Sequence, residues 1–449
     1  MLNKKIMSFF IIASIFSWAY PLYAEENHPS TLTLEQATQE SLEKNPELKA
    51  MEEDSKAAKA QVPQARSWED PQIGVRFYQV PFGEGLNQAM DIDYIISQKF
   101  PFPGKKKAAS QIAYHNYLHH LELLGARGRE ILKEIKVSYY NLYSIARRLE
   151  INQKIENNLK AAIQGAQSKI AANQTLALDS IQGQAELAKL LSEKEILKQN
   201  QINLQAKLNQ LLFREEKNNI LIPSKIETPH WDMSLEESIE IALLRQPKVK
   251  IAEHQIEEKK WVIKAAKRDF LPDMNAQLEY VQRPSGSPAN NLGNAWTGEF
   301  MFNVPLMIKK KTKAVEQAEA ELASAHYQYS AAKNDITFRV RDTYAKIQSY
   351  QKILDLNKKT LIPQTQQALD ASLAAYANGK TNFTSVLNSA RAVFDAQNEY
   401  WKTFESYTSA YSELEEALGA TREELAELKS PPQNSSAESH PSSQTGGKL

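Results

Sequence analysis

The chain of 449 residues has no cysteine, and its 54 Lys and Arg residues equal its 54 Asp and Glu residues. The lack of cysteine excludes disulfides, thiolate metal sites, cysteine nucleophiles and a lipid attached through a thiol. The balanced charge gives no net field that would attract nucleic acid. A secreted disulfide scaffold and a nucleic-acid-binding protein are therefore not expected.

Glycine and proline are also scarce, with 15 and 19 residues, while Ala, Gln, Glu, Lys and Leu, which favour helices, are abundant. This composition predicts a mainly α-helical protein. Long apolar runs are missing after the N-terminal region, so no later segment could cross a bilayer as a helix. If the mature chain spans a membrane, we expect it to do so with β-strands.

The two ends differ in composition from the rest. Lys4 and Lys5 precede an apolar run over residues 6–20, and Ala24 ends a small-residue cleavage site. We therefore expect residues 1–24 to be a secretory signal peptide. Residues 429–449 are rich in Ser, Pro and Gly and are predicted to be a disordered tail. Residues 25–428 remain for the fold.

An internal repeat organises this region. Leu34-Glu35 recurs as Leu235-Glu236, and Pro71 recurs as Pro272, each 201 positions later. Nearly forty residues align at this offset without a gap. The sequence therefore predicts a duplicated structural unit, with the first copy over residues 32–216, the second over residues 233–424, and a linker at 217–232.

Each repeat is predicted to contain a broken helix, a β-hairpin, and two long helices joined by a turn. The strands alternate between apolar and polar residues, as in Met90–Ser97, and each is about ten residues long, enough to cross a bilayer when tilted. Four strands cannot close a barrel, and open edges are not tolerated in lipid. A homotrimer with a shared twelve-stranded transmembrane β-barrel is the simplest closed arrangement.

The helix that starts at Lys105 is predicted to run to about residue 172, or roughly 100 Å. Apolar residues such as Ile131 and Ile135 recur along it with alternating three- and four-residue spacing, and the last helix shows the same period. This period is typical of coiled-coil packing. An exported coiled-coil structural protein is thus one alternative, although it leaves the hairpins and the duplication unexplained.

Three groups of motifs resemble the TolC-like outer-membrane efflux proteins over residues 32–424. They are the duplicated helix entries LEQATQESLEKNPEL and LEESIEIALLRQPKV, the strand exit QKFPFPGKKK, and the turn AYANGKTNF at 375–383. The segment VPFG at 80–83 before that exit looks most like the heavy-metal cation branch of the family. The resemblance implies an outer-membrane homotrimer that extends into the periplasm as an α-helical tunnel.

The resemblance also implies partners, namely a periplasmic adaptor and an inner-membrane efflux pump. In the family the turns between the long helices contact the adaptor. The corresponding residues here are Asn173, Gln174, Thr175, Leu176, Asn378, Gly379, Lys380 and Thr381. These residues are also what ordinary helix-hairpin turns require, and both interpretations can hold.

Two further sets of residues are candidates for the walls of a duct. The family often narrows its periplasmic mouth with acidic residues, where this chain has neutral Thr384 and Asn388, with Asp179 at the corresponding place in the first repeat. The barrel lumen is predicted to be lined by polar residues of the strands. These are Arg76, Asp91, Asp93, Gln277 and Glu299.

Chemistry-bearing motifs are otherwise few. His115 and His119 lie one helical turn apart, but a duct does not need a tight metal site, and we expect them to be ordinary helix residues. No phosphate-binding loop, zinc-hydrolase motif or nucleophile elbow is present, so neither enzymatic activity nor a cofactor is expected. The sequence predicts a passive exit duct for metal cations or small toxic compounds. The exit duct of a type I protein secretion system is the alternative within transport.

Overall fold

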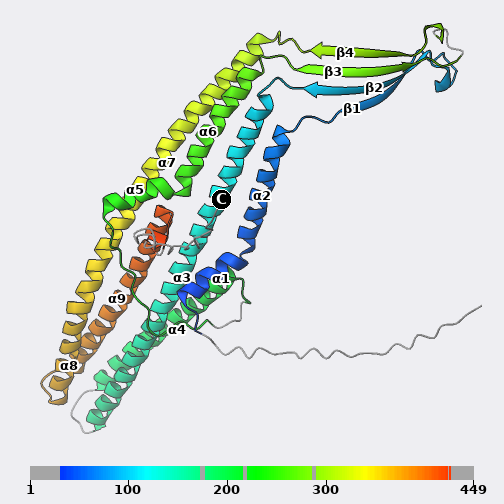
Figure 1. The fold of residues 1–449 in the computed structure, drawn as a ribbon. Helices are drawn as coiled ribbons and strands as arrows, with labels where there is room; N and C mark the ends of the chain where they lie inside the picture. Colours follow the sequence, from blue (N-terminus) through cyan, green and yellow to red (C-terminus); the bar gives the residue numbers. More distant parts are fainter. Residues whose placement is uncertain (1–30, 172–176, 216–219, 286–289, 423, 426–449) are drawn as a thin grey trace, which may run out of the picture.

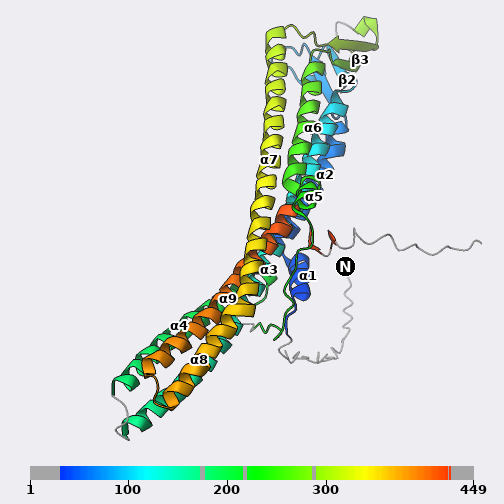
Figure 2. The same ribbon diagram turned by 90° about the vertical axis from the view of Figure 1, so that its left-hand side faces the viewer.

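The computed structural model describes residues 31–171, 177–215, 220–285, 290–422 and 424–425. Long helices form a shaft, and a β-sheet projects from one end of it (Figure 1). Figure 2 shows the shaft edge-on, with α6 and α7 reaching the sheet and α4, α8 and α9 gathered at the opposite end. The expected signal peptide and tail lie outside the described residues.

The first repeat contributes short helices, a strand pair and two long helices within the described ranges. These are α1 (Leu34–Lys44), α2 (Pro46–Arg66), β1 (Gln72–Tyr78), η1 (Leu86–Gln88), β2 (Asp91–Phe100), α3 (Lys105–Ala171) and α4 (Ala177–Leu212). The predicted long helix from Lys105 is confirmed, and its 67 residues extend about 100 Å.

The second repeat has the same order of elements. These are α5 (Leu235–Arg245), α6 (Pro247–Arg268), β3 (Met274–Gln282), η2 (Asn290–Leu292), β4 (Ala295–Phe302), α7 (Ile308–Leu356), η3 (Asn357–Leu361), α8 (Ile362–Ala377) and α9 (Phe383–Leu418). α1 and α5 begin 201 positions apart, and α4 and α9 each have 36 residues. The duplicated unit is thus present in the fold.

The helix starts show why the two repeats fold alike. Thr33 and Ser234 both form capping boxes, each accepting a hydrogen bond from the backbone three residues later. Asn45 and Gln246 then cap the next helices, where proline occupies the first position and needs no backbone donor. At each break in the predicted entry helix, one residue therefore ends the first helix and caps the start of the next.

Pro363 lies in the first turn of α8, on the helical stretch that leads to the second turn. The five residues before α8, Asn357–Leu361, form a π-helical turn between α7 and α8. Proline lacks an amide donor and its ring crowds the carbonyl four residues earlier, here that of Lys359. A wider π turn accommodates that crowding, so the chain continues as a helix with a local bulge.

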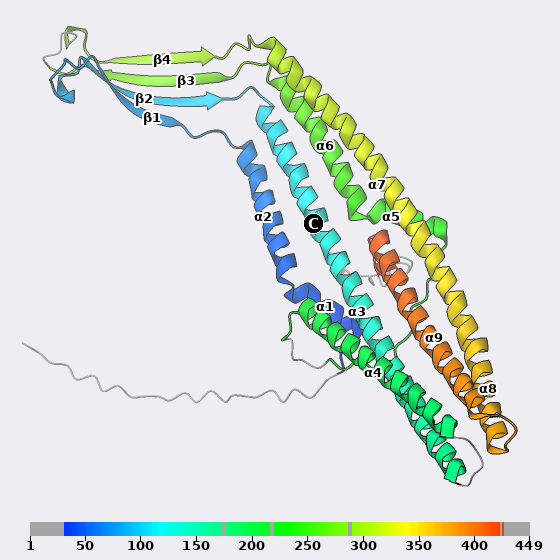
Figure 3. The same cartoon turned by 180° about the vertical axis from the view of Figure 1, so that it is seen from behind.

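The strands form one antiparallel sheet in the order β1-β2-β3-β4. Tyr94 pairs with both Val75 and Tyr280, and Tyr280 pairs in turn with Trp296. β1 and β4 are the two edges of the sheet (Figure 3). No helix within the described ranges is both long enough and apolar enough to traverse a bilayer.

The largest core lies mid-shaft, where α3, α7 and α9 meet the segments that lead into α1 and α5. Tyr139 of α3 donates a hydrogen bond to the Leu32 carbonyl at 2.9 Å, and Tyr407 of α9 donates to the Pro229 carbonyl at 2.6 Å. Burial raises the pKa of each phenol to about 12, so both remain donors at neutral pH. These two tyrosines attach the entry segments to the long helices.

Candidate functional site

The register of the sheet separates its residues into two faces with opposite character. Arg76 lies opposite Asp93, and Glu279 lies opposite Thr297, on one face. The other face presents apolar and aromatic side chains. Its exposed members are Ile73, Val75, Phe77, Tyr94, Ile96, Leu278, Trp296, Phe300 and Phe302. A sheet with an exposed apolar face and a charged opposite face is suited to separating lipid from a wet space.

An ion-pair network occupies the polar face. The Arg76 guanidinium donates to Asp93 Oδ2 at 2.8 Å and to Glu279 Oε1 at 2.5 Å, and so joins three strands. Asp93 is 3% exposed and Glu279 is 8% exposed. A buried carboxylate needs a partner, and Arg76 provides the same cation to both Asp93 and Glu279.

The five residues predicted for a lumen lie at positions of this same face. Arg76, Asp91 and Asp93 alternate along β1 and β2, while Gln277 lies opposite Glu299 across β3 and β4. Glu279 belongs with them but was not among the predicted residues. Its alternation with Tyr280 was visible in the sequence, whereas its approach to Arg76 depends on the pairing of β2 with β3.

The turn between α8 and α9 forms the distal end of one helical pair. Asn378 ends α8, and Gly379 adopts φ +70°, which glycine enters without steric cost. The Lys380 amide donates to the Ala375 carbonyl at 2.8 Å, and Asn382 caps α9 through the Ser385 amide. Lys380 is exposed and Thr381 is half-buried. The predicted residues Asn173, Gln174, Thr175 and Leu176 of the other turn lie outside the described residues.

The residues considered for a constriction lie near this end, on α4 and on the first turns of α9. Thr384 is exposed and donates a hydrogen bond to Gln182 of α4 at 2.9 Å, while Asn388 is exposed one turn farther along α9. Asp179 lies on α4, close enough to Tyr376 to affect it. Burial and, to a smaller extent, the Asp179 charge raise the pKa of the Tyr376 phenol. Asp179 therefore faces the α8 side of the turn.

Arg391 of α9 connects the two helical pairs and was not singled out from the sequence. It forms ion pairs with Glu193 at 2.9 Å and Glu186 at 3.4 Å, both on α4, and with Asp395 on its own helix. Its spacing from acidic residues of another helix could not be read from the sequence. α4 and α9 are thus held together by charge as well as by apolar packing.

The histidines lie between α3 and α6, in the half of the shaft nearest the sheet. The rings of His115 and His254 are 6.1 Å apart, centroid to centroid. Burial lowers the pKa of both His115 and His119. Among the residues that the structure describes, no group of three or more His, Asp or Glu side chains could hold a metal ion.

The comparisons with known proteins agree with this arrangement. A family model described as outer membrane efflux protein matches residues 37–212 and 238–420. The chain belongs to this family. Its members are outer-membrane channels and not enzymes, which confirms the family resemblance and overturns the coiled-coil structural alternative. This efflux protein is therefore located in the outer membrane and extends into the periplasm.

Solved structures share the fold of the efflux protein at low sequence identity. The CusC structure has a TM-score of 0.75 at 17% identity, with 87% of this chain and 93% of that chain covered. For VceC of Vibrio cholerae the TM-score is 0.74 at 17% identity, with coverages of 86% and 96%. For MtrE of Neisseria gonorrhoeae the TM-score is 0.71 at 15% identity, with coverages of 86% of this chain and 89% of that chain. No curated protein matches the chain.

Proposed function

We propose that the protein is the passive exit duct of a tripartite efflux system, built as a homotrimer. The observation that supports this most directly is a four-stranded sheet with two open edges, an apolar face and a charged face. Three such sheets, joined β4 to β1, give twelve strands with every backbone group paired. The Arg76 network then faces the lumen and the aromatic residues face lipid.

The helices continue the duct into the periplasm. α3 packs on α4 and α9, and α7 packs on α6 and α9, in a wall about 100 Å long that three copies would close into a tunnel. Energy for transport would come from an inner-membrane pump, and the duct itself would only conduct.

The α8–α9 turn is the proposed contact for a periplasmic adaptor. Asn378, Gly379, Lys380 and Thr381 lie at the end of the shaft farthest from the sheet, where a periplasmic partner can reach them (Figure 1). Thr384 and Asn388 lie one to two turns above and would face the tunnel mouth. Because both are neutral, a constriction there would select by size and polarity and not by an acidic ring.

The class of substrate follows only from the lining. The polar face carries both signs but more acidic than basic groups, since Arg76 pairs with both Asp93 and Glu279 while Asp91 and Glu299 lie on the same face, so the lumen would stay hydrated and would favour cations over anions. Metal cations and small toxic compounds both fit such a passage. The likeness to CusC and VceC, at 17% identity each, is one of fold alone and favours no substrate class.

The native mass of the mature protein, extracted in detergent from purified outer membranes, tests the trimer. We expect a trimer that converts to monomer on heating. Arg76→Met should weaken it, because Asp93 and Glu279 would be left buried without their cation, whereas Lys107→Met, an exposed change outside the sheet, should not. A soluble monomer absent from the outer membrane would rule out the duct.

A separate experiment tests the α8–α9 turn as the adaptor contact. The Lys380→Glu variant should retain the trimer but lose co-purification with the periplasmic adaptor encoded by the same bacterium. Lys352→Glu, an exposed lysine on α7 far from the turn, is the matched control and should retain co-purification. Equal recovery of the adaptor with both variants would show that the turn is not the contact.

A further inference from the structure

The apolar surface of the sheet does not stop where β4 ends. Residues 303–307 connect β4 to α7, which begins at Ile308, and four side chains of residues 303–308 are largely exposed. They are Val304 (69%), Leu306 (78%), Met307 (74%) and Ile308 (61%). Val304 follows Phe300 and Phe302 at two-residue spacing and so continues their side of the sheet. This run, here called the connector, extends the apolar face beyond the strand.

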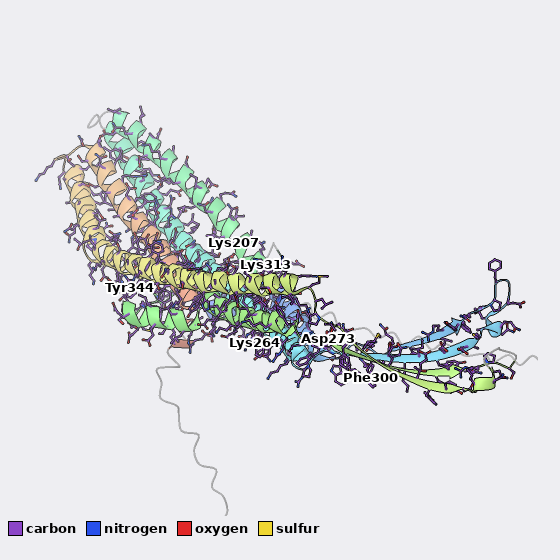
Figure 4. All side chains as sticks on the ribbon, turned by 90° about the horizontal axis from the view of Figure 1, so that it is seen from above. Lys207, Lys264, Asp273, Phe300, Lys313 and Tyr344 are labelled. Carbon is purple, nitrogen blue, oxygen red and sulfur yellow. The ribbon has the colours of Figure 1, made fainter. Side chains whose placement is uncertain are left out.

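Lysines follow the connector at once. Lys309 and Lys310 are exposed in the first turn of α7, and neither forms an ion pair within the described residues of this protomer. Lys311 bonds the Asp269 carbonyl and Lys313 pairs with Glu316, so these two already have partners. Figure 4 shows Phe300 on the sheet and Lys313 on α7, on either side of the connector.

The position of these lysines is unfavourable for the helix itself. The N-terminal turn of a helix favours acidic side chains, because its amides leave a partial positive charge there. α1 and α5 follow this preference with Glu35 and Glu236, whereas α3 and α7, which begin at the sheet, have no acidic residue in the first turn. Helix stability therefore does not account for Lys309 and Lys310.

The first repeat has the same order of apolar strand end and lysines, and one of its lysines is also fastened to the segment that leads into β3. After Phe100, Lys105 pairs with Asp273 at 2.8 Å and so fastens α3 to the entry of β3. No equivalent carboxylate within the described part of the protomer reaches Lys309 or Lys310. Lys309 and Lys310 are thus available to a group outside the protomer.

We propose that the connector with Lys309 and Lys310 binds anionic phospholipid at the periplasmic boundary of the outer membrane. This inference rests on the proposed barrel, which places the end of β4 at that boundary. Leu306, Met307 and Ile308 enter the acyl-chain edge, and the two lysines contact headgroup phosphates, as in interfacial anchors. The chain has no cysteine for a thioether lipid, and this band anchors the junction without one.

A second copy of the chain is the competing occupant. The edge of β4 would lie beside β1 of the neighbour, whose entry carries Glu69 and Asp70. Within one protomer Glu69 already pairs with Lys99 at 3.3 Å. The connector also lies on the apolar side of the sheet, which faces lipid and not the neighbouring strand. These observations favour phospholipid.

Native mass spectrometry of the detergent-extracted trimer, incubated with equimolar phosphatidylglycerol and phosphatidylcholine, tests the proposal. The wild-type trimer should retain phosphatidylglycerol in clear excess. Lys309→Gln with Lys310→Gln should lower that preference by about fivefold for each lysine. Lys352→Gln with Lys358→Gln, exposed lysines farther down the shaft, is the matched control and should leave it unchanged. Leu306→Ser with Met307→Ser should lower retention of both lipids.

The outcomes that overturn the proposal are distinct. Equal retention of both lipids by the wild-type trimer would show that the lysines do not select an anionic headgroup. Dissociation of the Lys309→Gln, Lys310→Gln trimer into monomers with an unchanged lipid ratio would assign the connector to the subunit interface. If the wild-type protein forms no trimer before lipid is added, the proposed barrel fails, and this inference fails with it.

Discussion

Lys136 of α3 donates a hydrogen bond to Glu415 of α9 at 2.7 Å, and both side chains are at least nine-tenths buried. The other Glu415 oxygen accepts from the Arg422 amide at 2.9 Å. The pair therefore joins the first repeat to the second and to the segment that follows α9. Its place is mid-shaft, close to the core that attaches α1 and α5.

We expect Lys136→Met to lower the free energy of unfolding by about 3 to 5 kcal/mol, because Glu415 would remain buried without its cation. Lys136→Met with Glu415→Gln should recover much of this loss. Urea denaturation of the detergent-solubilised protein measures both. Lys44→Met, which removes an exposed lysine from a carboxylate that Arg214 also pairs, is the control and should cost less than about 1 kcal/mol. Equal losses from the two lysines would show that burial does not matter here.

Gly183 permits a close approach between the helices near the tip. A Cβ there would lie 2.7 Å from Ile163 Cγ1 and 3.1 Å from Phe383 Cε1, whereas a Cβ at Gly165 would meet nothing within 4 Å. Gly183→Ala should thus destabilise the protein by about 1 to 3 kcal/mol through overpacking. Gly165→Ala should be neutral or stabilising by up to about 1 kcal/mol, since alanine favours helix.

The same urea measurement compares the two glycine variants. A stabilising effect of both substitutions would mean that α3 and α4 can separate without cost, and the close packing at Phe383 would then be unimportant. A loss from Gly183→Ala alone would support the tip as a rigid unit.

Much of the fold could be predicted because its signals are local or periodic. The caps at Thr33 and Asn45, the strand ending at Phe100 and the helix from Lys105 all depend on neighbouring residues. The apolar period of α3 was also reliable, since Ile131 and Ile135 are almost fully buried. Leu121 shares that period but is 42% exposed, because periodicity does not show which turns of a helix a partner covers.

Contacts between residues far apart in the sequence were harder to predict. The link from Arg76 to Glu279 depends on the register between β2 and β3, which belong to different repeats. The loops before β2 and β4 do not fix that register, and a slip of one residue would move Glu279 to the other face. Arg391 and its partners on α4 likewise depend on how two helical pairs are placed.

The π turn before Pro363 gives a prediction about local motion. Replacing Pro363 with Ala restores an amide donor and removes the crowding at the Lys359 carbonyl, so a regular α-helix can continue through residues 357–361. Hydrogen exchange of these amides should become slower than in the wild type. The amides of residues 385–395 on α9 serve as the reference and should not change. Unaltered exchange at 357–361 would mean that packing, and not the proline, maintains the π turn.

The histidines between α3 and α6 predict a loss of stability in mild acid. Burial lowers the pKa of His115 and His119 in the folded protein below the ordinary value of 6.5, so the unfolded chain binds these protons more readily. Stability is then greatest above pH 6.5. It falls as the pH drops from 6.5 through the lowered pKa values, and levels off below them.

Thermal unfolding followed by circular dichroism at pH 7.5 and pH 5.5 measures this fall. Carboxyl groups whose pKa is lowered, such as Glu156 beside Lys160 and Lys194, stabilise the fold fully above about pH 4.5 and lose that effect only below it. They therefore add no pH dependence between pH 7.5 and pH 5.5, where the histidines titrate. His115→Gln with His119→Gln should reduce the difference in Tm between the two pH values. His326→Gln, at an exposed position on α7, should keep it. An undiminished difference in the double variant would assign the acid sensitivity to other groups.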